Sequence, residues 1–183
     1  MSAGPIELHD SPCDRTIVFF DIVGSTAWID EHGDDAWVAL LRRCQPAISE
    51  IVDPPMGRLV AWRGDGFLAE FVEPSAALRA ILLVLEWFEA NGTLVRGSAH
   101  HGSVRHLAGD LAGLDVHVAA RLADVAEPGT VALSESFVRE ALPGLVVLLR
   151  ESRLRGLRSP VGATMATSSM LARETLLDTA LAA

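Results

Sequence analysis

The segment from Thr16 to Thr26 constrains this chain more than any other. It opens with TIVFF, five β-branched or aromatic residues of the kind that form a buried strand. Asp21 interrupts the apolar run, and Gly24 then permits a tight turn. Ser25 and Thr26 are residue types that cap helices, so a helix should start there. The segment therefore predicts a core strand that ends in a carboxylate, beside the outward-facing N–H groups of a helix start.

Two interpretations fit this arrangement. A carboxylate beside a helix N-terminus suits a metal ion that carries phosphates, because the carboxylate binds the cation and the helix end favours the anion. A strand-to-helix turn with a solvated Asp21 explains the same pattern. The segment alone favours neither interpretation.

The composition excludes several classes of protein. The chain has 183 residues, of which 50% are hydrophobic, enough for one domain with a sizeable core. Its net charge of −9 argues against a nucleic-acid binder, and its longest apolar run, residues 80–85, is too short to span a membrane. Two cysteines without metal-ligand spacing are typical of a reduced compartment, so we expect a soluble, cytoplasmic protein without nucleic-acid or membrane partners. Because all fifteen basic residues are Arg, only arginines or metal ions can receive a triphosphate.

The remaining sequence alternates between helical and strand-like periodicity. Helices are predicted over residues 34–52, 74–90, 115–126 and 134–142, and a helix or frayed tail over 170–183. Strands are predicted over residues 58–62, 67–71, 94–103, 131–133, 145–149 and 161–165, with a hairpin turn at 63–66 and a loop at 109–113. This order indicates an α+β sandwich built on a single sheet. It places Asp65 at the hairpin tip, where an acidic residue is common for structural reasons alone.

Two pairs of polar residues carry weaker signals. His100 and His101 lie on one predicted strand, but no third ligand stands at zinc-binding spacing, so one packed ring and one solvated ring are the simpler expectation. His117 and Arg121 are four residues apart and share one helical face, which is typical of a wet surface or a subunit contact.

Four motifs together resemble those of a known family. They are FFDIVGST at residues 19–26, GDGFLA at 64–69, VHVAARL at 116–122, and LRGL at 154–157 followed by Pro160 and Val161. In this order and spacing they are similar to the motifs of class III nucleotidyl cyclases, the adenylate and guanylate cyclase family. The resemblance covers residues 16–165. It implies a ferredoxin-like central sheet with helices packed on it, a catalytic domain over residues 16–168, an N-terminal tail over 1–15, and a C-terminal helix or tail over 169–183.

The resemblance also implies a chemistry. ATP, or another nucleoside triphosphate, would cyclise to a 3′,5′-cyclic nucleotide with release of pyrophosphate. Asp21, Asp65 and the backbone carbonyl of Ile22 would hold two divalent cations, Mg²⁺ or Mn²⁺. The phosphates would be bound by Arg155 and by the backbone N–H groups of Val23, Gly24, Ser25 and Thr26. The physical interpretation agrees, because two carboxylates at neighbouring loop tips repel each other unless cations lie between them.

In this family the site forms between two protomers, so the resemblance implies a head-to-tail homodimer with two sites. Arg121 of one chain would stabilise the transition-state charge beside the carboxylates of the other. His117 stands where Asn is usual, and it can still donate a hydrogen bond to the ribose. An isolated monomer is expected to be inactive.

The base pocket departs from the family pattern. Adenine-selective members carry a lysine where this chain has Ala61, whereas the partner aspartate is retained as Asp110. Arg63 faces the same side of the strand as Ala61 and is a candidate substitute. Loss of a charged hydrogen bond worth roughly 1.5–3 kcal/mol would relax base choice by about ten- to a hundredfold. We therefore expect an adenylate cyclase; the alternatives are a cyclase of relaxed base specificity, or a nucleotide-binding and dimerisation module with weak or no activity.

Overall fold

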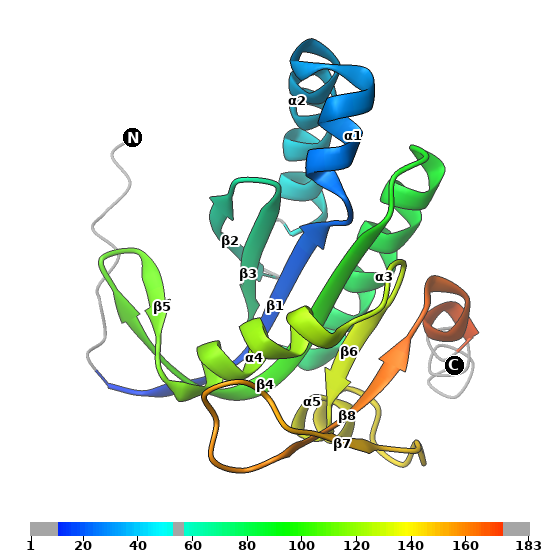
Figure 1. Cartoon of the computed structure of the whole chain (residues 1–183). Helices are drawn as coiled ribbons and strands as arrows, with labels where there is room; N and C mark the ends of the chain where they lie inside the picture. The colour runs from blue at the N-terminus through cyan, green and yellow to red at the C-terminus, as the bar shows by residue number, and fades with distance from the viewer. Residues whose placement is uncertain (1–10, 53–56, 174–183) are drawn as a thin grey trace.

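A computed structural model describes residues 11–52 and 57–173, which form an eight-stranded sheet with helices packed on it (Figure 1). The strands are β1 Cys13–Ile22, β2 Gly57–Arg63, β3 Gly66–Phe71, β4 Val95–Leu107, β5 Asp110–Ala112, β6 Val131–Ser134, β7 Arg150–Ser152 and β8 Val161–Ala166. The helices are α1 Ser25–His32, α2 Asp34–Ile51, α3 Pro74–Ala90, α4 Leu114–Val125 and α5 Glu135–Ala141. Residues 168–173 are also helical.

The sheet has the strand order β2-β3-β1-β4-β6-β8-β7, and β5 forms a hairpin with β4. β1 lies antiparallel between β3 and β4, whereas β4 and β6 run parallel and are joined by a crossover through β5 and α4. This confirms the α+β sandwich with a ferredoxin-like central sheet that the sequence predicted.

The alternation of side chains along β1 divides the core between the two faces of the sheet. Val18 and Phe20 belong to the larger core cluster, in which the sheet packs against the apolar side of α3. Ile17 points the other way and packs with Ala119 of α4. The candidate polar residues lie mostly on the second face, the one that α4 partly covers.

A bulge in β2 determines which of its side chains share this second face. Arg58 lies opposite Glu70 of β3, and Arg63 lies opposite Gly66, but the register shifts by one residue between Leu59 and Ala61. Because of the additional residue, Arg58 and Arg63 point to the same side of the sheet although they are five positions apart.

Most elements occur where the sequence predicts them, and three predictions are wrong. Residues 145–149 form no strand; their side chains include Val146 at 95% exposure, and the strand that pairs with β8 is β7 instead. Residues 110–112 are not a loop but the strand β5, which extends the β4 hairpin. The N-terminal cap of α1 is Gly24 in the left-handed conformation (φ 67°), with no capping side chain from Ser25 or Thr26.

The predicted boundaries of the two terminal segments can be compared with the observed elements. β1 begins at Cys13, inside the segment assigned to the N-terminal tail. The predicted C-terminal helix or tail is helical up to residue 173, and residues 174–183 lie outside the described part of the chain. No helix among the described residues combines the length and the apolar composition that crossing a bilayer requires.

Candidate active site

Asp21 and Asp65 come together at one end of the sheet. Asp21 is the last but one residue of β1 and lies opposite Gly66, so the β2–β3 hairpin brings the neighbouring Asp65 beside it. The pKa of Asp21 lies above its usual value, first because the carboxyl group is partly buried. Arg96 lowers this pKa, and the charge and hydrogen bonding of Asp65 raise it again. The two carboxyl groups therefore act on each other directly.

Arg96 is a site residue that sequence reasoning missed. It lies opposite Asp21 on β4, and its Nη2 donates to Asp21 Oδ2 at 3.0 Å. Both side chains line a hollow of about 260 Å³ together with Arg63 of the hairpin and Asp124 of α4. No local motif marks Arg96, because only the register of β1 against β4 brings it to the carboxylate.

A larger cavity, of about 420 Å³, lies elsewhere, between α5, β8 and residues 142–148. Its lining is mostly apolar, for example Leu133, Val138 and Leu142, and it contains no carboxylate. It offers no group for acid–base or metal chemistry, so the smaller hollow is the candidate active site.

The segment after β1 provides fewer free N–H groups than the sequence predicted. The N–H of Val23 donates to the carbonyl of Leu94 at 2.9 Å and is not available to a phosphate in this structure. Gly24 starts α1, whose first N–H groups have no partner within the helix. Gly24, Ser25 and Thr26 therefore stay as the candidate phosphate-binding backbone.

The donor set fits a hard divalent cation. The oxygens of Asp21 and Asp65 lie within interaction range of each other, and carboxylate oxygens are the ligands that Mg²⁺ and Mn²⁺ prefer. The described residues contain no cluster of three or more His, Cys, Asp and Glu side chains suited to a metal. Two carboxylates are thus the whole side-chain contribution, a number usual for cations that are also bound by water and substrate phosphates.

The candidate base-binding residues meet between β2 and β5. Arg63 Nη2 donates to Asp110 Oδ2 at 2.7 Å, and Asp110 Oδ1 accepts the N–H of Leu111 at 2.8 Å. Both side chains of the Arg63–Asp110 pair are about half exposed. Ala61 lies on the same side of β2 as Arg63. Arg63 thus already pairs with the carboxylate of Asp110, which a lysine at position 61 would otherwise approach.

The candidate catalytic residues of α4 are not bonded to the carboxylates within the described part of the chain. His117 is exposed, and Arg121 forms an ion pair with Asp124 on its own helix at 2.9 Å. Among the described residues, neither His117 nor Arg121 forms a hydrogen bond or ion pair with Asp21 or Asp65. Within the described part of the chain, the two sets of residues are therefore not joined by a polar contact.

Arg155 lies in the exposed segment between β7 and β8. The neighbouring Leu154 is buried, with 4% of its surface exposed, and anchors this segment in a small core cluster with Val118 and Leu122 of α4. Arg155 is thus attached to the same part of the fold as the α4 residues, and no contact joins it to the carboxylates within the described chain.

Comparison with known proteins finds adenylate cyclases among the relatives of this chain. No protein-family model matches the chain. An adenylate cyclase of Glutamicibacter nicotianae is 33% identical over 123 residues, which are 66% of this chain and 30% of that protein. A pH-sensitive adenylate cyclase of Mycobacterium tuberculosis is 29% identical over 129 residues, 69% of this chain and 32% of that protein. The chain thus spans about a third of the length of these relatives.

The solved structures agree on the fold. The guanylate cyclase domain of RhGC from Catenaria anguillulae, in complex with GTP, has a TM-score of 0.74 at 19% identity, over 84% of this chain and 96% of that domain. An adenylate/guanylate cyclase/hydrolase from Silicibacter pomeroyi has a TM-score of 0.68 at 22% identity, over 86% of this chain and 98% of that one. The fold is that of a nucleotidyl cyclase catalytic domain. Together with the sequence relatives, it shows that the chain belongs to the class III nucleotidyl cyclases.

Proposed function

We propose that this chain is a nucleotidyl cyclase that converts ATP into 3′,5′-cyclic AMP and pyrophosphate at a homodimer interface. The observation that carries the proposal is the interaction between the carboxyl groups of Asp21 and Asp65, of which Asp21 lines the hollow together with Arg96. The adenylate cyclases among the relatives support ATP as the substrate. The guanylate cyclase domains among the structural neighbours make GTP the first competitor to test.

Asp21 and Asp65, with the backbone carbonyl of Ile22, would hold two divalent cations, Mg²⁺ or Mn²⁺. When bound, these cations lower the pKa of the ribose 3′-hydroxyl and neutralise the triphosphate. Arg96 points into the same hollow and would take a share of the triphosphate charge. The N–H groups of Gly24, Ser25 and Thr26 would bind phosphate oxygens at the start of α1.

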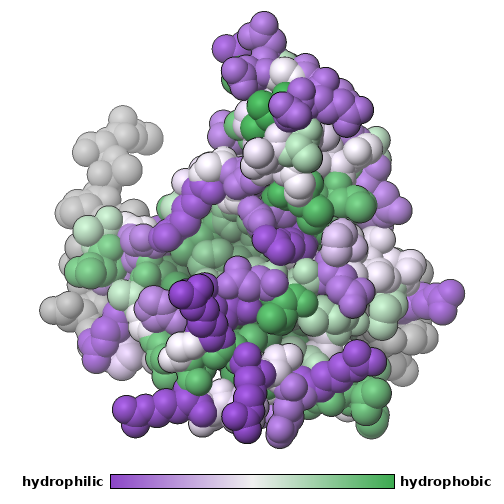
Figure 2. Space-filling model, viewed as in Figure 1, coloured by the Kyte–Doolittle hydropathy of each residue, from purple (hydrophilic) through white to green (hydrophobic). Residues whose placement is uncertain are grey.

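The second half of the site would come from another copy of the chain. Among the described residues, His117 and Arg121 form no hydrogen bond or ion pair with the carboxylates of their own chain, which supports a head-to-tail homodimer. In that dimer Arg121 would stabilise the charge that builds up in the transition state, His117 would bind the ribose, and Arg155 the terminal phosphates. Figure 2 shows a hollowed, largely apolar surface between α2 and α4, rimmed by hydrophilic side chains, on which a partner would lie.

The Arg63–Asp110 pair would read the base. Asp110 can accept a hydrogen bond from the adenine amino group, and Arg63 can donate a hydrogen bond to the ring nitrogen beside that group. Because an arginine replaces the lysine of the family pattern, from a position two residues further on, base choice would be less strict than in adenine-selective relatives.

A second candidate is a nucleotide-binding and dimerisation module with weak or no catalysis. It is favoured by Ala61 and His117, and by the ion pair that holds Arg121 to Asp124. The two carboxylates argue against it, because a module without catalysis has no need of a mutually repelling pair.

Turnover with each of ATP, GTP, CTP and UTP, in Mn²⁺ and in Mg²⁺, decides between these functions. Chromatography of the products should show cyclic AMP as the main product and a smaller yield from other nucleotides. No cyclic product from any nucleotide, with the dimer intact in solution, would support the module instead.

A further inference from the structure

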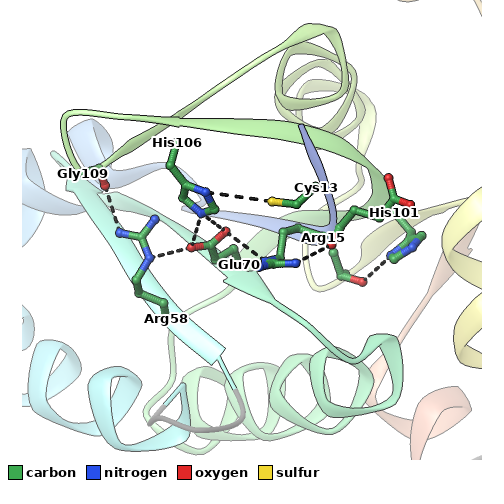
Figure 3. Close-up of polar contacts among 9 residues, drawn as sticks. Cys13, Arg15, Arg58, Glu70, His101, His106 and Gly109 are labelled. Atoms are coloured by element: carbon green, nitrogen blue, oxygen red, sulfur yellow. Dashed lines mark hydrogen bonds and ion pairs between the residues drawn. The ribbon is translucent and has the colours of Figure 1, made fainter. Parts of the chain in front are cut away.

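A buried carboxylate outside the proposed metal site organises the other end of the sheet. Glu70 of β3 is only 5% exposed, on a strand whose residues are all buried. Its carboxylate accepts a hydrogen bond from Arg58 Nε at 2.5 Å, and His106 Nε2 lies 3.0 and 3.1 Å from its two oxygens. Arg15 adds an ion pair at 3.8 Å. Figure 3 shows these groups, from the three strands β1, β2 and β4, converging on Glu70 of β3.

Arg58 connects this cluster to the β4–β5 turn. While its Nε is bound to Glu70, its Nη1 donates to the carbonyl oxygen of Gly109 at 2.9 Å (Figure 3). Gly109 has φ 86°, and Ala108 before it has φ 49°, the only positive φ of a non-glycine residue in the described part of the chain. A left-handed alanine is disfavoured and persists only where surrounding contacts hold it. Arg58 and His106, which lies on the same hairpin, supply such contacts.

The turn that Arg58 holds carries the candidate base-reading residue. Asp110 follows Gly109 directly and forms the ion pair with Arg63. β2 therefore contacts the hairpin twice, through Arg58 at the backbone and through Arg63 at the carboxylate. A shift of the turn would move Asp110 relative to Arg63, which lies on β2.

We propose that Arg58, held by Glu70, is a positioning residue for nucleobase recognition. It fixes the β4–β5 turn and thereby the carboxylate of Asp110, without touching the substrate. The inference rests on the proposed function, which gives Asp110 its role at the base. Stability alone explains the cluster less well, because the desolvation of a buried ion pair commonly cancels its attraction.

The variant Arg58→Lys tests the inference, because it keeps the charge but a single ammonium group cannot reproduce the fork that binds Glu70 and Gly109 together. The ratio of kcat/KM for ATP to that for GTP should fall about tenfold, mostly through KM for ATP, with kcat within about threefold of wild type. The matched control is Arg79→Lys, an exposed arginine on α3, which should leave all constants unchanged.

Glu70→Gln provides a second variant, which keeps the shape of the side chain and removes its charge. It should shift the ATP to GTP ratio in the same direction by a smaller factor, because Arg58 keeps an acceptor there. If the variants instead lower thermal stability and reduce turnover of both nucleotides equally, with KM and the ratio unchanged, the cluster is structural and the inference is wrong. If Arg58→Lys does not fold, Glu70→Gln decides by the same criterion.

Equilibrium binding of ATP and GTP, measured by calorimetry with Mn²⁺, separates this inference from the proposed function. A wild-type protein that makes no cyclic nucleotide refutes the function, and binding still tests the inference. A wild-type protein that turns over ATP, with a binding ratio unchanged in Arg58→Lys, refutes the inference alone.

Discussion

Asp65 is the residue whose substitution tests the proposed chemistry most directly. It stands at the hairpin tip, and its charge and hydrogen bonding raise the pKa of Asp21. Asp65→Asn should reduce turnover by about a thousandfold or more, because the charge stabilisation that bound cations supply is worth several kcal/mol. Product formation under saturating Mn²⁺ measures this loss, and circular dichroism checks the fold.

The control for that experiment is Asp35→Asn, which removes an exposed carboxylate from the first turn of α2. It should leave turnover at the wild-type level. Turnover retained in Asp65→Asn would remove the metal-binding role of Asp65.

Arg63 and Ala61 together determine the expected base choice. Arg63→Ala should lower the preference for ATP by about ten- to a hundredfold, because Asp110 loses its charged partner. Addition of Ala61→Lys to that variant should restore the preference from the position that the family pattern uses. Competition assays with ATP and GTP measure both effects, and an unchanged nucleotide profile in either variant would contradict the assignment of the pocket.

Sequence reasoning found the site residues that local motifs mark and missed those that tertiary register brings in. Asp21 and Asp65 are visible because each interrupts or follows an apolar run. Arg96 and Asp124 are not, because one depends on the pairing of β1 with β4 and the other on the packing of α4. The hydrogen bond from the Val23 N–H to the carbonyl of Leu94, which makes this N–H unavailable to a phosphate, depends on strand register in the same way.

At the scale of helices and strands, hydrophobic periodicity was enough to predict an element wherever that element has a buried face of its own. α3 runs over the predicted residues 74–90 because its apolar side is continuous. Periodicity failed for β5, which has three residues and depends on the β4 hairpin. It also failed for residues 145–149, an apolar run that finds no strand partner, while the charged β7 pairs with β8.

The contact between β4, α4 and α5 predicts a pH dependence of stability. His100 is buried; its ring nitrogens lie 3.1 Å from Asp115 of α4 and 3.0 Å from Ser134 at the start of α5. Burial lowers the pKa of His100 from 6.5, Asp115 opposes this shift, and His101 adds to it. As the pH falls through 6.5, the unfolded chain binds a proton that folded His100 does not, so the free energy of unfolding decreases until the lowered pKa is reached.

His100→Asn should therefore show a smaller loss of stability between neutral pH and that lowered pKa. Urea unfolding at a series of pH values measures the slope in each protein. Parallel slopes in wild type and His100→Asn would contradict the assignment, whatever the difference in absolute stability.

At the scale of the whole molecule, the two sets of catalytic residues predict complementation between chains. Asp65→Asn and Arg121→Ala should each be inactive alone, because each homodimer lacks one half of both sites. Equal amounts mixed and allowed to exchange should recover about a quarter of wild-type turnover, because half of the dimers are mixed and each carries one intact site of two. A mixture that stays inactive despite subunit exchange would place both residues in one chain's site.

The bulge in β2 has a consequence for how the proposed nucleotide preference could be lost. The extra residue between Leu59 and Ala61 sets the phase of the strand, so that both arginines reach the same hairpin. If β2 paired with β3 without the bulge and kept all its residues, Arg58 and Arg63, five positions apart, would lie on opposite sides of the sheet, although every candidate residue would still be present. The proposed discrimination between purines would then disappear through a change of strand register, which a residue-by-residue alignment scores as harmless.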